Sequence, residues 1–275
     1  MIIADGRAIA QKILNKIKAG LDGRRISIAA IWMGNDPAVG RFVELKKKYA
    51  ESIGMEFRVH HFGTDVSEKE LMDKLRILNA DKSMTGIIVE LPLPKNLDQI
   101  KVLDTIPPEK DIDILSSAAQ ENYYKDRSKI LPPAVRALEL LFNEHRINPL
   151  GKTAAVFGQG MLVGMPVSHW LEKSGAKVFR IDEHTSNPGE LSRQADIIVS
   201  GVGKPGLIHG NMVKKGAVVV DFGYGKIGNK MAGDVEFDSV ASRSSLITPV
   251  PGGMGPLVIA SFLENALEFS ERAAL

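Results

Sequence analysis

The sequence of 275 residues contains no cysteine, which excludes disulfides, thiolate metal ligands and a cysteine nucleophile. Its net charge of +2 is too small to indicate a nucleic-acid or membrane-surface partner. No apolar run has the length of a membrane span, and the first residues lack the features of a signal peptide. The six histidines show no metal-ligand spacing, and no Walker loop, nucleophile elbow or zinc motif occurs. We therefore expect a cytoplasmic protein without a metal site.

Apolar segments alternate between two periodicities along the chain. Runs without polar alternation are typical of strands in a sheet that is covered on both faces, and helical spacing separates them. Strands are predicted at 26–32, 56–62, 86–91, 153–157, 177–181, 195–200, 217–221 and 246–248. Helices are predicted at 7–17, 39–53, 67–78, 134–144, 165–174 and 257–274, with an irregular stretch at 107–133. This alternation predicts an α/β fold with parallel sheets, and the length favours two domains.

A glycine-rich turn, Gly158 to Gly164, follows one predicted strand and precedes a helix. Such a turn lets phosphate groups reach backbone N–H groups and the positive end of a helix. Its spacing is one residue longer than the usual dinucleotide fingerprint, so a tight turn with a packing glycine is the alternative. Asp182 ends the next strand, where an acid can bond ribose hydroxyls, and Gly201 to Gly206 forms a second glycine-rich loop. Together they predict nucleotide binding.

Two proline-stiffened segments follow apolar strands. Pro249 to Pro256 combines prolines, which fix the backbone angle φ, with glycines, which permit positive φ. Leu91 to Pro94 is a shorter segment with two prolines. We expect them to form two walls of one cleft; a rigid interdomain linker is the alternative for the first.

Two groups of charged residues are candidates for chemistry. Lys46 belongs to a lysine run that is otherwise expected to be a solvated face, but it lies four residues beyond Phe42 and therefore on the same side of a helix. Asp111 and Asp113 follow a pair of prolines, and their alternative role is to cap a turn.

In their order along the chain these segments resemble the bifunctional methylenetetrahydrofolate dehydrogenase/methenyltetrahydrofolate cyclohydrolases of the FolD type. The resemblance covers almost the whole length. It is carried by Asp5–Ala10, Gly34–Ala38, Val89–Pro94, Pro108–Asp113, the Gly158 turn, Gly203–Gly206, Gly233–Val235 and Ile247–Pro256.

The resemblance implies two α/β domains around a cleft, the second Rossmann-like, with a folate-binding catalytic domain at 1–140 plus 257–275 and a dinucleotide-binding domain at 141–256. It implies Lys46 as the catalytic lysine and Asp113 as the carboxylate that anchors the pterin, with Phe42 and Glu90 beside them. The implied substrate-binding residues are Pro92, Pro249, Pro251, Gly252 and Gly253. The implied cofactor-binding residues are Gly158, Gln159, Gly160, Asp182, Thr185, Gly203 and Tyr224.

The chain departs from the family pattern at four positions. Phe42 stands where a tyrosine is usual, Glu90 where a glutamine is usual, Gln159 where an arginine is usual, and Ile114 where a glycine is common. Phe42 removes a hydroxyl that can relay protons. A carboxylate at Glu90 would hold a neighbouring lysine charged, which suits an electrostatic or acid role better than that of a base.

The expected activity is oxidation of 5,10-methylenetetrahydrofolate with NADP, followed by hydrolysis of the product to 10-formyltetrahydrofolate, with the hydrolytic step weakened. The alternatives are a folate- or dinucleotide-binding protein without turnover, a dehydrogenase-only homologue, and a related dehydrogenase of another small acid. NAD is the alternative cofactor, because Gln159 cannot neutralise a phosphate and Asp182 would repel one. The resemblance also implies a homodimer that acts on one-carbon derivatives of tetrahydrofolate.

Overall fold

The computed structural model describes residues 1–228 and 230–272. The chain groups into two compact units. The six-strand unit comprises residues 1–11 and 134–258, and the three-strand unit comprises residues 12–133 and those from 259 on. The chain crosses from one unit to the other at three places: within helix α1 (Gly6–Gly20), after the first residue of α6 (Pro133–His145) and within α10 (Met254–Arg272).

The three-strand unit is built on a parallel sheet in the order β3-β2-β4. Its strands are β2 (Ser27–Met33), β3 (Glu56–Phe62) and β4 (Gly86–Val89). Its own helices are α2 (Pro37–Ser52), α3 (Glu68–Ala80), α4 (Gln99–Leu103) and α5 (Ser117–Tyr124). Helix α2 begins where the Asp36 side chain accepts a hydrogen bond from the Ala38 amide, and Ser67 caps α3 in the same way. These caps explain why both helices start directly after their loops.

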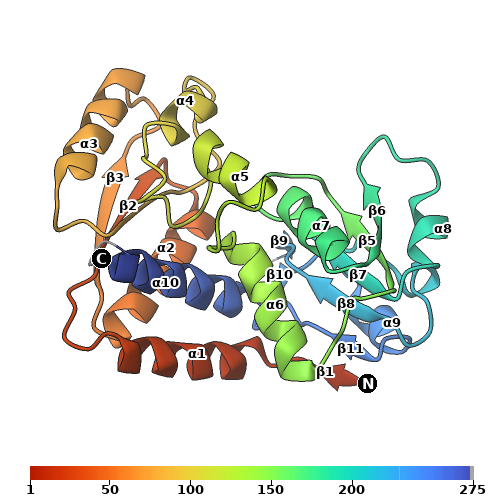
Figure 1. Cartoon of the computed structure of the whole chain (residues 1–275). Helices are drawn as coiled ribbons and strands as arrows, with labels where there is room; N and C mark the ends of the chain where they lie inside the picture. The colour runs from red at the N-terminus through yellow and green to blue at the C-terminus, as the bar shows by residue number, and fades with distance from the viewer. Residues whose placement is uncertain (229, 273–275) are drawn as a thin grey trace. The chain divides into compact units, whose positions relative to one another are not determined.

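The six-strand unit contains a parallel sheet in the order β1-β11-β8-β7-β5-β6 (Figure 1). The strands are β1 (Ile2–Ile3), β5 (Thr153–Phe157), β6 (Lys177–Ile181), β7 (Ile197–Ser200), β8 (Val218–Asp221) and β11 (Leu246–Ile247). The remaining elements are α7 (Gly164–Lys173), α8 (Pro188–Ser192), η1 (Gly210–Met212), α9 (Phe237–Ala241) and an antiparallel hairpin of β9 (Gly225–Ile227) and β10 (Lys230–Ala232). Because β6 and β7 lie on opposite sides of β5, the strand order reverses at β5, and this confirms the Rossmann-like arrangement.

The core of the six-strand unit consists of fully or almost fully buried aliphatic side chains together with Phe157. One face of β5, β7 and β8 contributes to it through Ala155, Phe157, Ile198 and Val219. Residues on the other face of these strands, such as Val156, Val199 and Val220, are buried as well. The unalternating pattern of the sequence therefore reflects burial on both sides of the sheet.

Each strand and helix predicted from the sequence is present within a few residues of its expected bounds. The predicted end of the last helix at residue 274 lies outside the described residues. The interpretation of 107–133 as wholly irregular is wrong, because α5 lies within it, and Ser116 caps that helix. The sequence also missed β1, α4, α8, η1, α9 and the β9–β10 hairpin. These elements are short and carry little periodicity.

The contacts divide the chain differently from the expected division at residue 140. Residues 1–11 and 134–140 lie in the six-strand unit. The reason for the first group is that β1 pairs with β11, Ile2 opposite Leu246 and Ile3 opposite Ile247, and the Ala4 amide donates to the Ile247 carbonyl at 2.9 Å. Among residues 1–228 and 230–272, no helix combines the length and the hydropathy of a membrane span.

Candidate functional site

A buried ion pair lies in the three-strand unit. Lys46 of α2 and Glu90, directly after β4, are only 5% and 7% exposed. Lys46 Nζ donates to Glu90 Oε1 at 2.7 Å. Backbone pairing holds Glu90 in place, because its amide donates to the Ile31 carbonyl at 2.9 Å. The two residues that the sequence singled out at positions 46 and 90 are therefore direct partners.

Two aromatic rings flank the ammonium group of Lys46. Its Nζ lies 5.0 Å from the ring centroid of Phe42 and 5.5 Å from that of Phe262. The contact with Phe42 follows from the four-residue spacing on α2. Both rings present an electron-rich face that favours a cation over a neutral amine. Phe262, from α10, was not among the residues that the sequence analysis selected.

The environment of Lys46 favours its charged form. Burial alone lowers the pKa of Lys46, but the charges of Glu90 and Asp113 and the hydrogen bond to Glu90 outweigh burial and raise the pKa above its ordinary value. Lys46 is therefore an ammonium group near neutral pH. This agrees with the expectation that Glu90 would hold the lysine charged.

The two aspartates after Pro108 have different environments. Asp111 is buried, and its Oδ2 accepts from the amides of Leu115 and Ser116 at 2.9 and 2.7 Å. Asp111 is thus a turn-stabilising carboxylate. Burial is the main cause that raises the pKa of Asp113 to about 6; the charge of Lys46 opposes the shift, and the charges of Glu90 and Asp111 add to it. Of the two, Asp113 has the carboxyl group that is electrostatically coupled to Lys46.

The backbone around Asp113 is held by a residue far along the chain. Ile114 has φ of 58°, which is a strained conformation for a β-branched side chain. Asn265 of α10 is fully buried and donates from Nδ2 to the carbonyls of Ile112 and Leu131 at 2.9 and 3.0 Å. Asn265 therefore ties down the residue before Asp113. Its polar character at a core-facing position of an apolar helix was the signal that the sequence offered.

We expect Asn265→Ala to destabilise this loop, because it leaves the buried carbonyl of Ile112 and the partly buried carbonyl of Leu131 without their donor. An unsatisfied buried group costs about 1–3 kcal/mol and the partly buried carbonyl costs less, so the free energy of unfolding should fall by roughly 1–4 kcal/mol. Urea unfolding measures this change. Asn79→Ala, which removes a single donor to the Thr105 carbonyl in the same unit, is the control and should cost less. Equal losses in the two variants would contradict the account.

In the six-strand unit, the glycines of the Gly158 turn differ in the structural reason for a glycine at each position. Gly158 has φ of 82°, and a Cβ on Gly164 would lie 1.7 Å from the Gly158 carbonyl oxygen. These two glycines are required by the tight turn itself. A Cβ on Gly160 would meet nothing within 4 Å, so the space beside Gly160 is open to a ligand at the N-terminus of α7. The tight-turn interpretation therefore holds for Gly158 and Gly164, and phosphate binding beside Gly160 stays a prediction.

Gln159 is directed toward its own strand. Its Nε2 donates to the carbonyls of Val156 and Gly158, both at 3.0 Å. The side chain therefore stabilises the exit from β5.

The end of β6 carries an acid whose hydrogen bonds are internal. Asp182 Oδ1 accepts from Thr185 Oγ1 at 2.8 Å and from the His184 amide at 3.0 Å. The hydrogen bond from Thr185 is the first cause that lowers the pKa of Asp182. Arg180 donates from two nitrogens to the Glu172 carboxylate at 3.1 and 2.9 Å. The structure thus places an ionised carboxylate at this position, and Glu172 engages Arg180, which lies two residues before Asp182.

The loop after β7, Gly201 to Gly206, lies beside the loop after β8. Gly203 has φ of 78°, and a Cβ there would lie 3.7 Å from the Tyr224 carbonyl oxygen. Tyr224 is 40% exposed. Because both loops follow the carboxyl ends of parallel strands, Gly203 and Tyr224 share one edge of the sheet with the Gly158 turn.

The proline-glycine segments belong to different units. Pro92 is exposed and follows Glu90 in the three-strand unit, whereas Pro249, Pro251, Gly252 and Gly253 belong to the six-strand unit. Gly252 has φ of 104°. A Cβ on Gly6 would lie 1.8 Å from the Gly253 carbonyl oxygen, so the start of α1 packs directly on this segment. Close backbone packing explains part of its glycine content.

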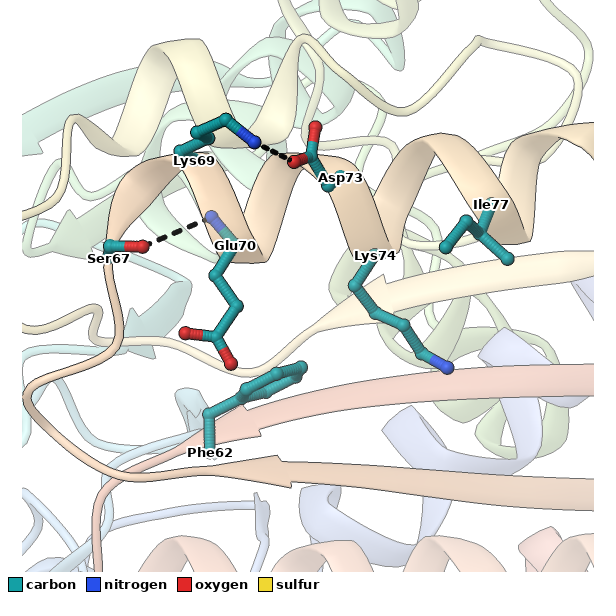
Figure 2. Close-up of a pocket in the computed structure, with 7 residues that line it drawn as sticks. All are labelled: Phe62, Ser67, Lys69, Glu70, Asp73, Lys74 and Ile77. Carbon is teal, nitrogen blue, oxygen red and sulfur yellow. Dashed lines mark hydrogen bonds and ion pairs between the residues drawn. The ribbon is translucent and has the colours of Figure 1, made fainter.

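Figure 2 shows a surface hollow elsewhere in the three-strand unit, between the end of β3 and helix α3. It is lined by Phe62, Ser67, Lys69, Glu70, Asp73, Lys74 and Ile77. Lys69 and Asp73 form an ion pair on its rim, and none of the candidate site residues lines it. Within the part of the chain that the structure describes, no group of three His, Asp or Glu residues is arranged to hold a metal.

These features define a class of protein. One unit has a doubly wound sheet with glycine-rich loops at the strand-order reversal, and the other has a lysine–carboxylate centre with a second carboxyl group electrostatically coupled to it. This is the arrangement of a two-unit α/β enzyme with a dinucleotide-binding sheet.

Comparison with known families agrees with this class. Residues 132–274 match the NAD(P)-binding domain of tetrahydrofolate dehydrogenase/cyclohydrolase, and residues 4–113 match the catalytic domain. The chain belongs to the tetrahydrofolate dehydrogenase/cyclohydrolase family. It is 36% identical to the bifunctional protein FolD of Aquifex aeolicus over 98% of this chain and 96% of that protein. The FolD protein of Moorella thermoacetica is 37% identical, over 98% and 99%.

Solved structures show the same relationship. The bifunctional FolD enzyme of Campylobacter jejuni has a TM-score of 0.94 at 33% identity, covering 98% of both chains. The FolD enzyme of Trypanosoma brucei, complexed with NADP and an inhibitor, has a TM-score of 0.96 at 30% identity, covering 99% of this chain and 98% of that one.

Proposed function

We propose that this chain oxidises 5,10-methylenetetrahydrofolate to 5,10-methenyltetrahydrofolate with NADP and hydrolyses the product to 10-formyltetrahydrofolate. Family membership supports both reactions. The observation that carries the proposal is the buried Lys46–Glu90 pair with Asp113 electrostatically coupled to it, in a chain whose other unit has the dinucleotide-type sheet. We assign the folate chemistry to the three-strand unit and dinucleotide binding to the six-strand unit.

The residues of the lysine centre have separate roles in this proposal. A dinucleotide held by the six-strand unit would supply the acceptor for a hydride from the bridging carbon of the folate. Loss of that hydride leaves a cation spread over two nitrogens, so the step depends on alignment more than on a strong base. Asp113 anchors the pterin by accepting hydrogen bonds, and Pro92, Pro249, Pro251, Gly252 and Gly253 contact the substrate.

The dinucleotide fits the loops of the six-strand unit. The open space beside Gly160 and the N-terminus of α7 suit a pyrophosphate, and Gly158 permits the turn that presents them. Gln159, Gly203 and Tyr224 complete the proposed contacts, with Asp182 and Thr185 at the adenosine end. The support for this assignment is the open space beside Gly160, the N-terminus of α7 and the positive φ of Gly158.

Hydrolysis of the methenyl group is the weaker activity in this proposal. Water must add to the methenyl carbon and lose both of its protons, one of which is released while the other goes to a ring nitrogen when the carbon–nitrogen bond breaks. Lys46 is held as an ammonium by Glu90 and two aromatic rings, and Phe42 has no hydroxyl to relay a proton. Lys46 therefore acts as an electrostatic group or an acid and is a poor base, which is why this step is the weaker one; Glu90 acting as the base is the alternative.

The direct test is absorbance in the near ultraviolet with methylenetetrahydrofolate and each dinucleotide in turn. Methenyltetrahydrofolate and reduced dinucleotide both absorb there, so turnover gives a rising trace. A flat trace with measurable binding would support the alternative of a binding protein without turnover. A rising trace with no enzymatic decay of added methenyltetrahydrofolate would support a dehydrogenase-only enzyme.

We predict that NADP is used, with a kcat/KM that differs from that of NAD by less than about a hundredfold. The Asp182 carboxylate repels a 2′-phosphate, and Arg180 is engaged by Glu172. Asp182→Asn should move the ratio toward NADP, because it removes the negative charge and keeps the side-chain size. Steady-state kinetics with both cofactors measure the ratio. A preference beyond a hundredfold for either cofactor would contradict this description of the pocket.

The dehydrogenase should lose activity on the acid side because of Asp113. Its pKa is raised to about 6, so the carboxylate that anchors the pterin exists above that pH and is protonated below it. We expect kcat/KM for the folate to fall about tenfold per pH unit below the pKa. Asp113→Asn should lower kcat/KM at neutral pH and remove this limb of the profile. An unchanged acid limb in that variant would assign it to another group.

We further propose a cytoplasmic homodimer. Its support is the family resemblance and, for the compartment, the absence of cysteine, which suits a reducing environment. Light scattering should give twice the mass of one chain; the mass of a single chain would refute the dimer. Fractionation of cells that produce the protein tests the compartment.

A further inference from the structure

The Gly233-Asp234-Val235 segment has no role in the function described so far, yet it carries a fully buried carboxylate. Asp234 Oδ2 accepts from Ser200 Oγ at 2.7 Å and from the Val202 amide at 2.8 Å. Its Oδ1 accepts from the Lys204 amide at 2.7 Å. Two of the three donors are therefore backbone groups of the glycine-rich loop after β7.

A second buried carboxylate supports the first. Asp221, at the end of β8, accepts at Oδ1 from the amides of Gly223 and Asp234, at 2.7 and 3.2 Å, and at Oδ2 from the Val235 amide at 3.0 Å. In the sheet Asp221 lies opposite Ser200. Asp221 thus holds the segment that bears Asp234, and Asp234 holds the loop that follows Ser200.

Two glycines make room for these carboxylates. A Cβ on Gly223 would lie 2.3 Å from Cγ of Asp234, and a Cβ on Gly233 would lie 2.1 Å from Oδ2 of Asp221. Neither position accepts a side chain without displacing a carboxylate. The pair of aspartates and the pair of glycines therefore form one built structure, which we call the aspartate relay (Asp221, Gly223, Gly233 and Asp234).

The aspartate relay restrains a loop that would otherwise be flexible. The loop contains Gly201, Gly203 and Gly206, and glycine loses the most backbone freedom when a chain becomes ordered. Hydrogen bonds to a buried carboxylate are stronger than those between neutral groups. Holding the loop in one shape before a ligand arrives lowers the entropy that binding must overcome.

We propose that Asp234 is a positioning residue for the reaction, which holds the loop after β7 in the shape that receives the dinucleotide, with Asp221 as its support. This inference rests on the proposed function, because it takes the carboxyl edge of β5 and β7 as the dinucleotide site. Asp234 acts through the backbone of Val202 and Lys204 and makes no contact of its own with the reacting atoms.

The test is Asp234→Asn in the full chain, with titration calorimetry of NADP and NAD and steady-state kinetics. The amide keeps the size of the carboxylate but turns one acceptor into a donor that faces a backbone N–H. The dissociation constant for the dinucleotide should rise about 10- to 100-fold, the loss typical of hydrogen bonds to a charged group. KM for methylenetetrahydrofolate should change much less. Ser200→Ala, which retains both amide bonds to Asp234, should change dinucleotide affinity by only about two- to threefold.

The outcomes separate this inference from the proposed function. If the wild-type chain binds neither dinucleotide, the proposed function fails. If the wild type binds and Asp234→Asn binds equally well, with only a lower Tm, Asp234 is merely structural and the inference is overturned. If Asp234→Asn does not fold, hydrogen exchange of the wild type without ligand decides the matter. Slow exchange at the Val202 and Lys204 amides supports the inference, and rapid exchange at both overturns it.

Discussion

Lys46→Met is expected to abolish the hydrolysis of methenyltetrahydrofolate and to leave dinucleotide binding intact. General acid–base help is worth about a hundred- to ten-thousandfold in rate, and Lys46 is the buried cation of this centre. The dinucleotide loops belong to the six-strand unit, so their affinity should not change. Decay of methenyl absorbance measures the hydrolysis, and titration calorimetry measures dinucleotide binding.

Two further variants are needed for comparison, because Lys46→Met also leaves Glu90 buried without its cation. Breaking a buried ion pair by removing one partner costs about 3–5 kcal/mol. Lys46→Met with Glu90→Gln removes that penalty, and it should recover stability without recovering hydrolysis. Lys47→Met is the matched control, since Lys47 is 39% exposed on the same helix and lies 4.0 Å from Glu51. Substantial hydrolysis by Lys46→Met would show that Lys46 is not the catalytic lysine.

Phe42→Tyr combined with Glu90→Gln is expected to raise the hydrolytic rate, by about ten- to a hundredfold. Glu90→Gln removes the charge and the charge-assisted hydrogen bond that raise the pKa of Lys46, so its pKa should fall and the lysine can exchange protons. Phe42→Tyr adds a hydroxyl beside the lysine, because the ring lies 5.0 Å from Nζ. The rate of methenyl hydrolysis across a pH series measures the effect.

The single variants apportion this gain. Glu90→Gln alone tests the effect of the charge on Lys46, and Phe42→Tyr alone tests proton transfer through the added hydroxyl. If the two changes act together, the gains in rate of the single variants fall short of the gain in the double variant. An unchanged or lower rate in the double variant would mean that Glu90 is itself the base, and that this chain moves the proton by another path. In that case Glu90→Gln alone should be the most damaging of the three.

The main elements could be predicted from the sequence because their signals are local. The β-branched and aliphatic run of β5 and the seven residues of β3 identify strands on their own. The starts of helices α2 and α3 are marked in the sequence by the N-capping residues Asp36 and Ser67. β1 has only two residues and exists through pairing with β11, so no local pattern could reveal it.

The same distinction applies to the site. The four-residue spacing of Phe42 and Lys46 on one helix, and the family pattern around Glu90 and Asp113, were sufficient to select these residues. Phe262 and Asn265 were not selected, because they lie on α10 and reach the site only through packing. Gln159 and Thr185 were selected, but the sequence could not show that their polar groups bond to Val156, Gly158 and Asp182.

The sequence by itself determined the class of fold and the positions of the main strands, because periodicity, glycine and proline placement and residue order are properties of short segments. The family resemblance selected Lys46, Glu90 and Asp113 as candidates for the site. Only the tertiary structure decided that Glu90 pairs with Lys46, that Asn265 secures the Asp113 loop and that Asp234 secures the loop after β7. These contacts join residues far apart along the chain. They depend on distances of a few ångströms that only the packed molecule specifies.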